Sequence, residues 1–335
     1  MWTRSFIAGL ALALAVGAGA AAAQGYAGAN DPDCRKALDY SAARRGAAVL
    51  VLKDGKPICE GYAGEGAPDH AMETASGTKS FVGAMLAAAV QDRLLALDEP
   101  VADTVTEWKA DPRKAKVTIR QLLSLSSGMP SEVGHPPTYA DAVKMPLTAE
   151  PGTKFLYGPA PYMAFGEVMR RKLTAAGQPG DPYLYLKRRV LDPIELHPGQ
   201  WRRTPNGDAL LPQGAVLSVR EWVKYGEFIR AGGKAGGRQI VDAATLKAEF
   251  QPSPANPAYG ITWWLPANNP GGVRAREDYS RVPKDMVIAR GAGDQRLIVV
   301  SSKGITAARL ATPPGQGRPA GPAWSDIDFI GFFMH

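Results

Sequence analysis

A serine and a lysine stand three residues apart in the segment Thr74–Gly83, as Ser76 and Lys79. Residues 81–90, which follow, are almost all apolar or small, which is typical of a helix that is buried on every side. If Ser76 opens that helix, Lys79 lies one turn further along the same face. A hydroxyl beside a half-buried amine is a candidate activated nucleophile. The same residues also fit a helix cap next to a solvated lysine.

Two further stretches carry groups that could serve one reaction with this pair. Tyr157 lies in a turn rich in proline and glycine at 155–161, where its phenol could carry a proton or simply pack as an aromatic ring. The second stretch is Arg290-Gly291-Ala292-Gly293, at the end of a predicted strand. Its small residues would let a substrate carbonyl approach the backbone, whereas an arginine at a strand end is often a surface cation.

The elements that must position these groups fall into a simple order. Predicted strands lie at both ends of the chain and predicted helices lie between them. We expect an antiparallel sheet built from 46–62 and 258–311, including a strand at 259–265, with a helical insertion at about 67–250. Alternation along that strand places Trp263 and Trp264 on opposite faces, so only one of them, taken as Trp264, lines the site.

Helices are predicted at 33–45, from Ser76 to about residue 95, and at 324–334. The two terminal helices should cover one face of the sheet and the Ser76 helix the other. This is an α/β arrangement of the α+β type.

The order of the motifs resembles a known superfamily. The Ser76–Lys79 pair is followed by Ser-Phe, then by Leu95–Pro100, Val117–Gly128, Tyr259–Trp264 and Gly291–Gln295. This succession is similar to that of the serine β-lactamase, penicillin-binding protein and carboxylesterase superfamily. The likeness is greatest to the branch of esterases, class C-type enzymes and nylon-oligomer hydrolases. It implies a β-lactamase/transpeptidase-like fold over one domain, 24–335, with a sheet part at about 31–66 and 251–335 and a helical part at about 67–250.

The resemblance also implies roles for these residues. Ser76 would form an acyl-enzyme, with Lys79 as a base if burial lowers its pKa. Tyr157 matches the tyrosine of the family's Tyr-x-Asn motif and would share the proton, held partly ionised by the Lys79 cation. Which of the two takes the first proton stays open. The oxyanion hole would use the N–H of Ser76 and an N–H near Ala292 or Gly293.

Two positions depart from the family pattern. Pro159 stands where the motif has asparagine, and Arg290 stands where a Lys-Thr-Gly or His-x-Gly motif has its basic residue. Arg290 could grip a substrate carboxylate bidentately but cannot carry a proton. We therefore expect a serine hydrolase acting on a small ester, amide or peptide. The alternatives are a catalytically degenerate module that binds cell-wall peptide or amino-acid oligomers, and a true β-lactamase or D-aminopeptidase.

Composition excludes several other classes of protein. The 335 residues carry a formal net charge of +7 without a Lys/Arg block, so no nucleic-acid partner is expected.

Residues 1–23 are typical of a secretory signal, with an uncleaved anchor as the alternative, so we expect a periplasmic or secreted protein without a stable membrane span. Cys34 and Cys59 could then form a disulfide or remain two buried thiols. Two cysteines and four histidines show no metal-ligand spacing, and no cofactor is expected.

Overall fold

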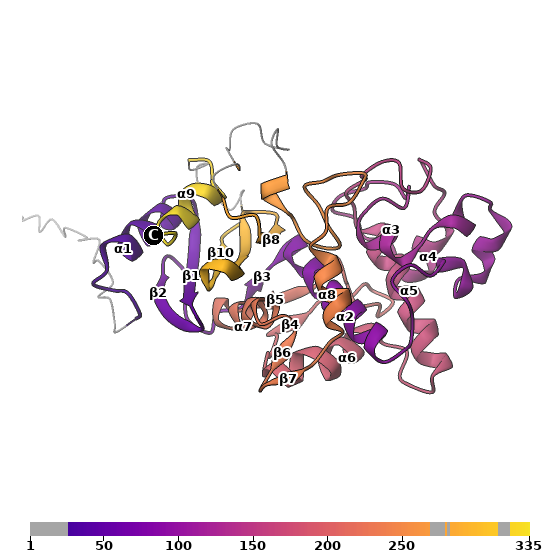
Figure 1. Cartoon of the computed structure of the whole chain (residues 1–335), viewed down its shortest axis with the longest axis horizontal. Coiled ribbons are helices and arrows are strands. Elements are labelled where there is room, and N and C mark those ends of the chain that lie inside the picture. The colour runs from indigo at the N-terminus through magenta and orange to yellow at the C-terminus, as the bar shows by residue number, and fades with distance from the viewer. Residues whose placement is uncertain (1–25, 269–278, 280–281, 314–321) are drawn as a thin grey trace, which may run out of the picture.

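The computed structural model describes residues 26–268, 279, 282–313 and 322–335. The predicted signal peptide at 1–23 lies outside these residues. The sheet with α1 and α9 forms one end of the molecule, and α3, α4 and α5 form the other (Figure 1). The helices are α1 (Pro32–Ala42), α2 (Lys79–Gln91), α3 (Ile119–Leu123), α4 (Tyr139–Lys144), α5 (Ala160–Ala175), α6 (Pro182–Leu186), α7 (Val219–Arg230), α8 (Ala243–Glu249) and α9 (Asp326–Gly331).

The strands form one main sheet and two small ones. The main sheet has the order β2-β1-β10-β9-β8, and every neighbouring pair is antiparallel. Its strands come from both ends of the chain, so the predicted α+β fold with an antiparallel sheet is confirmed. The strands are β1 (Gly46–Lys53), β2 (Lys56–Tyr62), β3 (Met72–Glu73), β4 (Gln200–Trp201), β5 (Ala215–Leu217), β6 (Lys234–Ala235), β7 (Arg238–Gln239), β8 (Met286–Gly291), β9 (Gln295–Val300) and β10 (Ile305–Ala311).

The terminal helices cover one face of the sheet, as predicted. Val49, Val51 and Ile298 of the strands share a buried cluster with Ala37 of α1 and Phe329 of α9. The opposite face is covered by α7, which contacts β1, β9 and β10. The prediction that the Ser76 helix covers this face is therefore wrong. Helix α7 packs on the sheet through Gly226 and on Phe81 of α2 through Tyr225, and it has the stronger amphipathic pattern.

Four predicted elements have different bounds. Helix α1 spans Pro32–Ala42 rather than 33–45, and it begins at Pro32 since the Asp31 carboxylate caps it by accepting from the N–H groups of Asp33 and Cys34. Helix α9 spans Asp326–Gly331 rather than 324–334, because the Ser325 side chain caps it by accepting from the Asp328 N–H. Helix α2 ends at Gln91 rather than near 95, because Arg93 has a positive φ of 57°. The strand predicted at 259–265 is a turn instead, with Thr262 at φ 65° and only isolated bridges from Trp264 to its neighbours.

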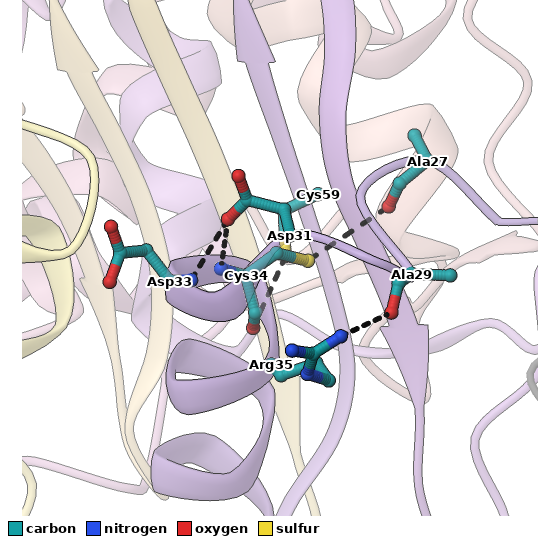
Figure 2. The surroundings of a disulfide bond; sticks show 7 residues. All are labelled: Ala27, Ala29, Asp31, Asp33, Cys34, Arg35 and Cys59. Carbon is teal, nitrogen blue, oxygen red and sulfur yellow. Dashed lines mark hydrogen bonds between the residues drawn. A yellow bond between two sulfur atoms is a disulfide. The ribbon is translucent and has the colours of Figure 1, made fainter.

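A disulfide bond ties α1 to β2. Cys34 and Cys59 are joined, as the first of the two sequence alternatives predicts (Figure 2). Both residues are buried in the cluster beneath the terminal helices. The bond therefore anchors the N-terminal helix to the outer strand of the sheet, at the edge opposite β8.

Over the described ranges, no helix combines the length and the apolar character that a membrane span requires.

Candidate active site

Ser76 and Lys79 meet in a tight turn at the start of α2. A short 3₁₀ helix at Ala75–Thr78 runs directly into α2. Residues three apart are eclipsed in a 3₁₀ helix, so the two side chains share one face. The Lys79 amine donates to Ser76 Oγ over 3.1 Å and to the carbonyl oxygen of Pro212 over 3.3 Å.

The Lys79 side chain is buried, with 3% of its surface exposed. Burial disfavours the ammonium form and lowers the pKa of Lys79 from 10.5 to about 7. A large fraction of this lysine is therefore a neutral amine at neutral pH, able to accept a proton from the hydroxyl beside it.

Side-chain hydroxyls fix the turn that carries Ser76. Thr74 donates to the carbonyl oxygen of Ala215 in β5, and the Ala215 N–H donates to Thr78 Oγ1. The two threonine oxygens lie 3.1 Å apart. Between them, Ala75 has a φ of 47°, a left-handed conformation that is unusual for a residue with a Cβ. The residue before the candidate nucleophile is thus strained, and its neighbours hold it in place.

Two glycines let other elements reach the same turn. A Cβ on Gly77 would lie 2.6 Å from the Trp222 ring of α7. A Cβ on Gly291, the last residue of β8, would lie 2.1 Å from the carbonyl oxygen of Thr74. The sheet edge and the nucleophile turn are therefore in backbone contact.

Tyr157 lies beside this pair, in the turn that precedes α5. The Lys79 amine is 4.9 Å from the centroid of its ring. Burial raises the pKa of Tyr157, although the Ser76 hydroxyl and the Trp264 indole partly offset this by hydrogen bonding to the phenol. The prediction of a partly ionised Tyr157 is therefore wrong, because desolvation outweighs the groups that favour the phenolate.

Half-buried aromatic rings surround the phenol. The ring centroids of Tyr157 and Trp264 lie 5.7 Å apart. The ring centroid of Phe155 lies 6.2 Å from that of Tyr157 and 6.0 Å from that of Trp264. Trp263, by contrast, is fully buried and donates to Glu249. Behind these rings, the Tyr259 and Tyr162 hydroxyls are hydrogen-bonded at 3.0 Å. This side of the site is apolar and aromatic.

Pro159 is a structural residue at the position where the family motif has an amide. It is buried at the start of α5, and its carbonyl oxygen accepts from the N–H groups of Tyr162 and Met163. It therefore begins a helix and offers a substrate neither an amide side chain nor an N–H.

The Arg290 side chain lies on the face of the main sheet that α1 and α9 cover. Its guanidinium pairs with Asp326 of α9 at 2.9 Å and donates to the Tyr279 hydroxyl at 2.7 Å. It also lies 5.4 Å from the Trp264 ring. Burial raises the pKa of Tyr157, and the nearby charge of Arg290 offsets part of that effect. The cation that sequence reasoning assigned to a substrate carboxylate pairs with the Asp326 carboxylate in the fold.

The direction of the β8 backbone identifies a candidate oxyanion donor. The N–H and C=O of Ile288 bond with Trp264 at the free edge of the sheet, away from β9. In an antiparallel strand this direction alternates, so Gly291 turns its carbonyl toward β9. A trans peptide points its N–H opposite to its C=O, so the Ala292 N–H faces the free edge. That edge contacts the turn of Ser76.

The structure brings Ser76, Lys79, Tyr157, Trp264 and the 291–293 backbone into one region. Sequence reasoning missed the Pro212 carbonyl, the threonines that fix the turn, and Phe155. No local motif marks Pro212, because its role depends on a contact 133 residues away along the chain. The described part of the chain contains no group of His, Cys, Asp and Glu suited to a metal ion.

A protein-family model matches most of the chain. Residues 23–316 match the family model described as Beta-lactamase. Protein flp of Staphylococcus aureus (strain N315) is 32% identical over 108 residues, which are 29% of this chain and 21% of that protein. The chain thus matches only about a fifth of the length of this curated relative.

Solved structures share the fold at low sequence identity. A candidate beta-lactamase from Bacteroides dorei DSM 17855 superposes with a TM-score of 0.69 at 18% identity, covering 89% of this chain and 95% of that one. A family VIII carboxylesterase superposes with a TM-score of 0.65 at 17% identity, covering 92% and 98%. At these identities, the likeness establishes the fold alone.

Proposed function

The chain belongs to the beta-lactamase family, and we propose that it is a serine hydrolase that cleaves a small ester or amide through an acyl-enzyme on Ser76. The observation that carries this proposal is the 3.1 Å hydrogen bond from a buried Lys79 amine to Ser76 Oγ. A serine hydroxyl needs a positioned base, and this amine has its pKa in the useful range.

In the proposed reaction, Lys79 is the first base. At neutral pH part of Lys79 is the free amine, whereas Tyr157 keeps its proton because its pKa is raised. Ser76 Oγ attacks the substrate carbonyl carbon while its proton passes to Lys79 Nζ. The tetrahedral oxyanion is stabilised by the N–H groups of Ser76 and Ala292. The leaving group then departs with a proton from the Lys79–Tyr157 pair, and water later releases the acyl group.

The proposed substrate presents an apolar group to the site. Phe155, Tyr157 and Trp264 supply a half-buried aromatic surface beside Ser76. Arg290 is engaged by Asp326, and Pro159 provides no amide group. These features favour an uncharged ester over a substrate that needs a carboxylate clamp. The similarity to a family VIII carboxylesterase supports the same choice.

The decisive test is covalent labelling of the mature protein. Purified protein is treated with a fluorophosphonate or with penicillin, and its intact mass is measured. We expect an adduct with the fluorophosphonate that is lost in Ser76→Ala, whose unfolding free energy stays within about 1 kcal/mol of wild type. The rate of labelling should rise with pH through about 7, as Lys79 loses its proton. A folded protein that forms no adduct with either reagent refutes the proposal.

A second candidate rests on Pro159. Loss of the amide position could leave a module that binds cell-wall peptide or amino-acid oligomers without cleaving them. Calorimetry with D-alanyl peptides distinguishes the two: binding without turnover, unchanged in Ser76→Ala, supports the module, and measurable turnover excludes it. Nitrocefin and D-alanyl amides, assayed in parallel, test a true β-lactamase or D-aminopeptidase.

We also propose export with cleavage after residue 23. The Cys34–Cys59 disulfide supports this, because such bonds persist in oxidising compartments. N-terminal sequencing of the protein from a periplasmic or culture fraction tests it: a mature chain that begins at residue 24 is expected, and an intact Met1 in the membrane fraction contradicts it.

A further inference from the structure

Arg296, in β9, is a buried cation that contacts both ends of the turn between β8 and β9. Its Nη1 donates to the carbonyl oxygens of Gln295 at 2.9 Å and Gly291 at 3.3 Å. Its Nη2 donates to Asp294 Oδ1 at 3.4 Å, and its Nε donates to Asp326 Oδ1 at 2.6 Å. One side chain thus joins both ends of the turn to helix α9.

The carboxylate of Asp326 holds this guanidinium in place. Burial alone would raise the pKa of Asp326, but the charges of Arg296 and Arg290 outweigh that effect and hold the pKa well below its usual range. Trp324 adds a hydrogen bond from Nε1 to Oδ1 at 2.6 Å. The pair is therefore ionised, hydrogen-bonded and nearly inaccessible, which restricts the movement of Arg296.

Two residues of the turn have a left-handed backbone conformation. Gly293 and Asp294 both have positive φ values, of 76° and 65°. A segment that contains glycine and a left-handed aspartate has several accessible conformations. Arg309 and Arg45 also hold Asp294, through its carbonyl oxygen at 2.7 Å and its carboxylate at 3.1 Å. The side-chain bond to the Gly291 carbonyl comes from Arg296.

The bond to Gly291 has a consequence for the candidate site. The peptide plane that carries the Gly291 carbonyl also carries the Ala292 N–H, which points in the opposite direction. A donor that holds the carbonyl on the β9 side therefore holds the N–H toward the edge that contacts the turn of Ser76. Rotation of this plane would turn the proposed oxyanion donor away from the nucleophile.

We propose that Arg296 is a positioning residue of the reaction: through the Gly291 carbonyl, and anchored by Asp326, it orients the Ala292 N–H toward the oxyanion. This role rests on the proposed function. Arg296 does not touch the substrate, so it acts on transition-state stabilisation rather than on substrate binding. The C-terminal helix is thereby coupled to the chemistry, although it lies on the opposite face of the sheet.

The experiment uses the full mature chain and hydrolysis of p-nitrophenyl butyrate. Arg296→Lys keeps the charge but loses the fork that reaches Gly291 and Asp326 together, and Arg296→Met loses both. Because an oxyanion donor is typically worth about 10²–10³ in kcat, a misdirected one should lower kcat by roughly 10–100-fold, with KM within about 3-fold. Fluorophosphonate labelling should slow by the same factor, and Arg296→Lys should retain more activity than Arg296→Met.

A matched control separates positioning from stability. Arg171 also bridges two carboxylates, Glu107 and Glu167, and a backbone carbonyl, but it lies in the helical part. Arg171→Lys should lower the melting temperature and leave kcat unchanged. If Arg296 variants fail to fold, Asp294→Asn on the partly exposed turn keeps a side chain that tolerates the positive φ and removes the charge that pairs with Nη2. The Asp294 carboxylate also pairs with Arg45, so Arg45→Met is made in parallel. Asp294→Asn should lower kcat without changing KM, and Arg45→Met should leave kcat unchanged.

Any of three results would overturn the positioning role and leave the hydrolase intact. The first is wild-type kcat in folded Arg296 variants, and the second is an equal kcat loss in Arg296→Lys and Arg171→Lys. The third applies where the Arg296 variants do not fold: wild-type kcat in Asp294→Asn, or an equal kcat loss in Asp294→Asn and Arg45→Met. A wild-type protein that neither turns over the ester nor forms an adduct would overturn both.

Discussion

Gly291 and Thr74 are in direct backbone contact: a Cβ on Gly291 would lie 2.1 Å from the Thr74 carbonyl oxygen. Thr74 is two residues before Ser76, and Gly291 immediately precedes the proposed oxyanion donor. The separation between nucleophile and donor is therefore set by a contact in which no side chain intervenes. Glycine is needed here for space, since its φ is not in the left-handed region.

Replacing Gly291 should separate the two halves of the site. In Gly291→Ala the new methyl group must displace β8 from the nucleophile turn, with a cost of about 1–3 kcal/mol in unfolding free energy, as for other overpacked sites. We expect kcat to fall more than KM rises. Gly331→Ala, at an exposed position in α9 with no atom near the added Cβ, is the control. It should keep wild-type kcat and leave the unfolding free energy level or higher by up to about 1 kcal/mol, since alanine is the better helix former. Wild-type kcat in Gly291→Ala would show that the contact is not needed.

Replacing Ala75 by glycine should cost less unfolding free energy than the same change at an alanine in a regular helix. A residue with a Cβ loses about 1–2 kcal/mol in the left-handed region, and glycine does not. The unfolding free energy of Ala75→Gly should therefore stay level or rise by up to about 1 kcal/mol, since the greater chain entropy of glycine offsets part of the gain. Urea denaturation measures this against Ala244→Gly, an exposed position in α8, which should lose about 1 kcal/mol. Equal losses in both variants would mean that Ala75 is not strained.

Removing the disulfide should affect stability and leave chemistry alone. Cys34 and Cys59 are 25 residues apart, and closing a loop of that size stabilises a fold by about 3 kcal/mol. A variant with both cysteines changed to alanine should unfold at lower urea concentration with kcat unchanged, because the bond lies at β2, at the sheet edge opposite β8. A fall in kcat below the unfolding transition would instead link α1 to the site.

Much of this arrangement is encoded in local patterns. The buried helix after Ser76 and the sheet segment at 46–62 were predictable, because each depends on residues within a few positions of one another. The Ser76–Lys79 pair was predictable for the same reason. Its chemistry was not, since the pKa of Lys79 depends on burial by segments distant in the sequence.

The errors have the opposite origin. Alternation at 259–265 predicts a strand, but Thr262 turns the chain there and donates its N–H to the Leu123 carbonyl. The pairing of Arg290 with Asp326 was not foreseen, because Asp326 lies 36 residues later and outside the local pattern. Both α2 and α7 have apolar residues that could pack on the sheet, and the long-range contacts of α7 with β1, β9 and β10 decide which helix covers it. In each case a long-range partner outweighs the local signal.

The Tyr157 phenol should matter for kcat, and a neighbouring phenol should not. In Tyr157→Phe the ring packing is kept and the proton carrier is lost, so kcat for an ester should fall by roughly 10²-fold, within the range for general acid–base groups. Tyr259→Phe is the matched control, because its hydroxyl bonds only to Tyr162 among the described residues and lies behind the aromatic surface. If both variants lose activity equally, the effect comes from packing rather than from proton transfer.

Lys79 should destabilise the fold in a way that depends on pH. Its pKa is about 7 in the folded protein and 10.5 in the unfolded chain, so between these values the unfolded state binds more protons and stability rises with pH. The penalty is largest below pH 7 and vanishes above about 10.5. Lys79→Met should therefore raise the unfolding free energy by roughly 2–4 kcal/mol at pH 6, and by much less at pH 10.

Urea denaturation at pH 6, 8 and 10 measures this change. Lys116→Met, at an exposed position, is the control, and its effect should not vary over that range. A gain in Lys79→Met that stays constant with pH would mean that the buried amine keeps its ordinary pKa. Lys79 could not then be the first base at neutral pH, and the free amine beside Ser76 would form only in alkali.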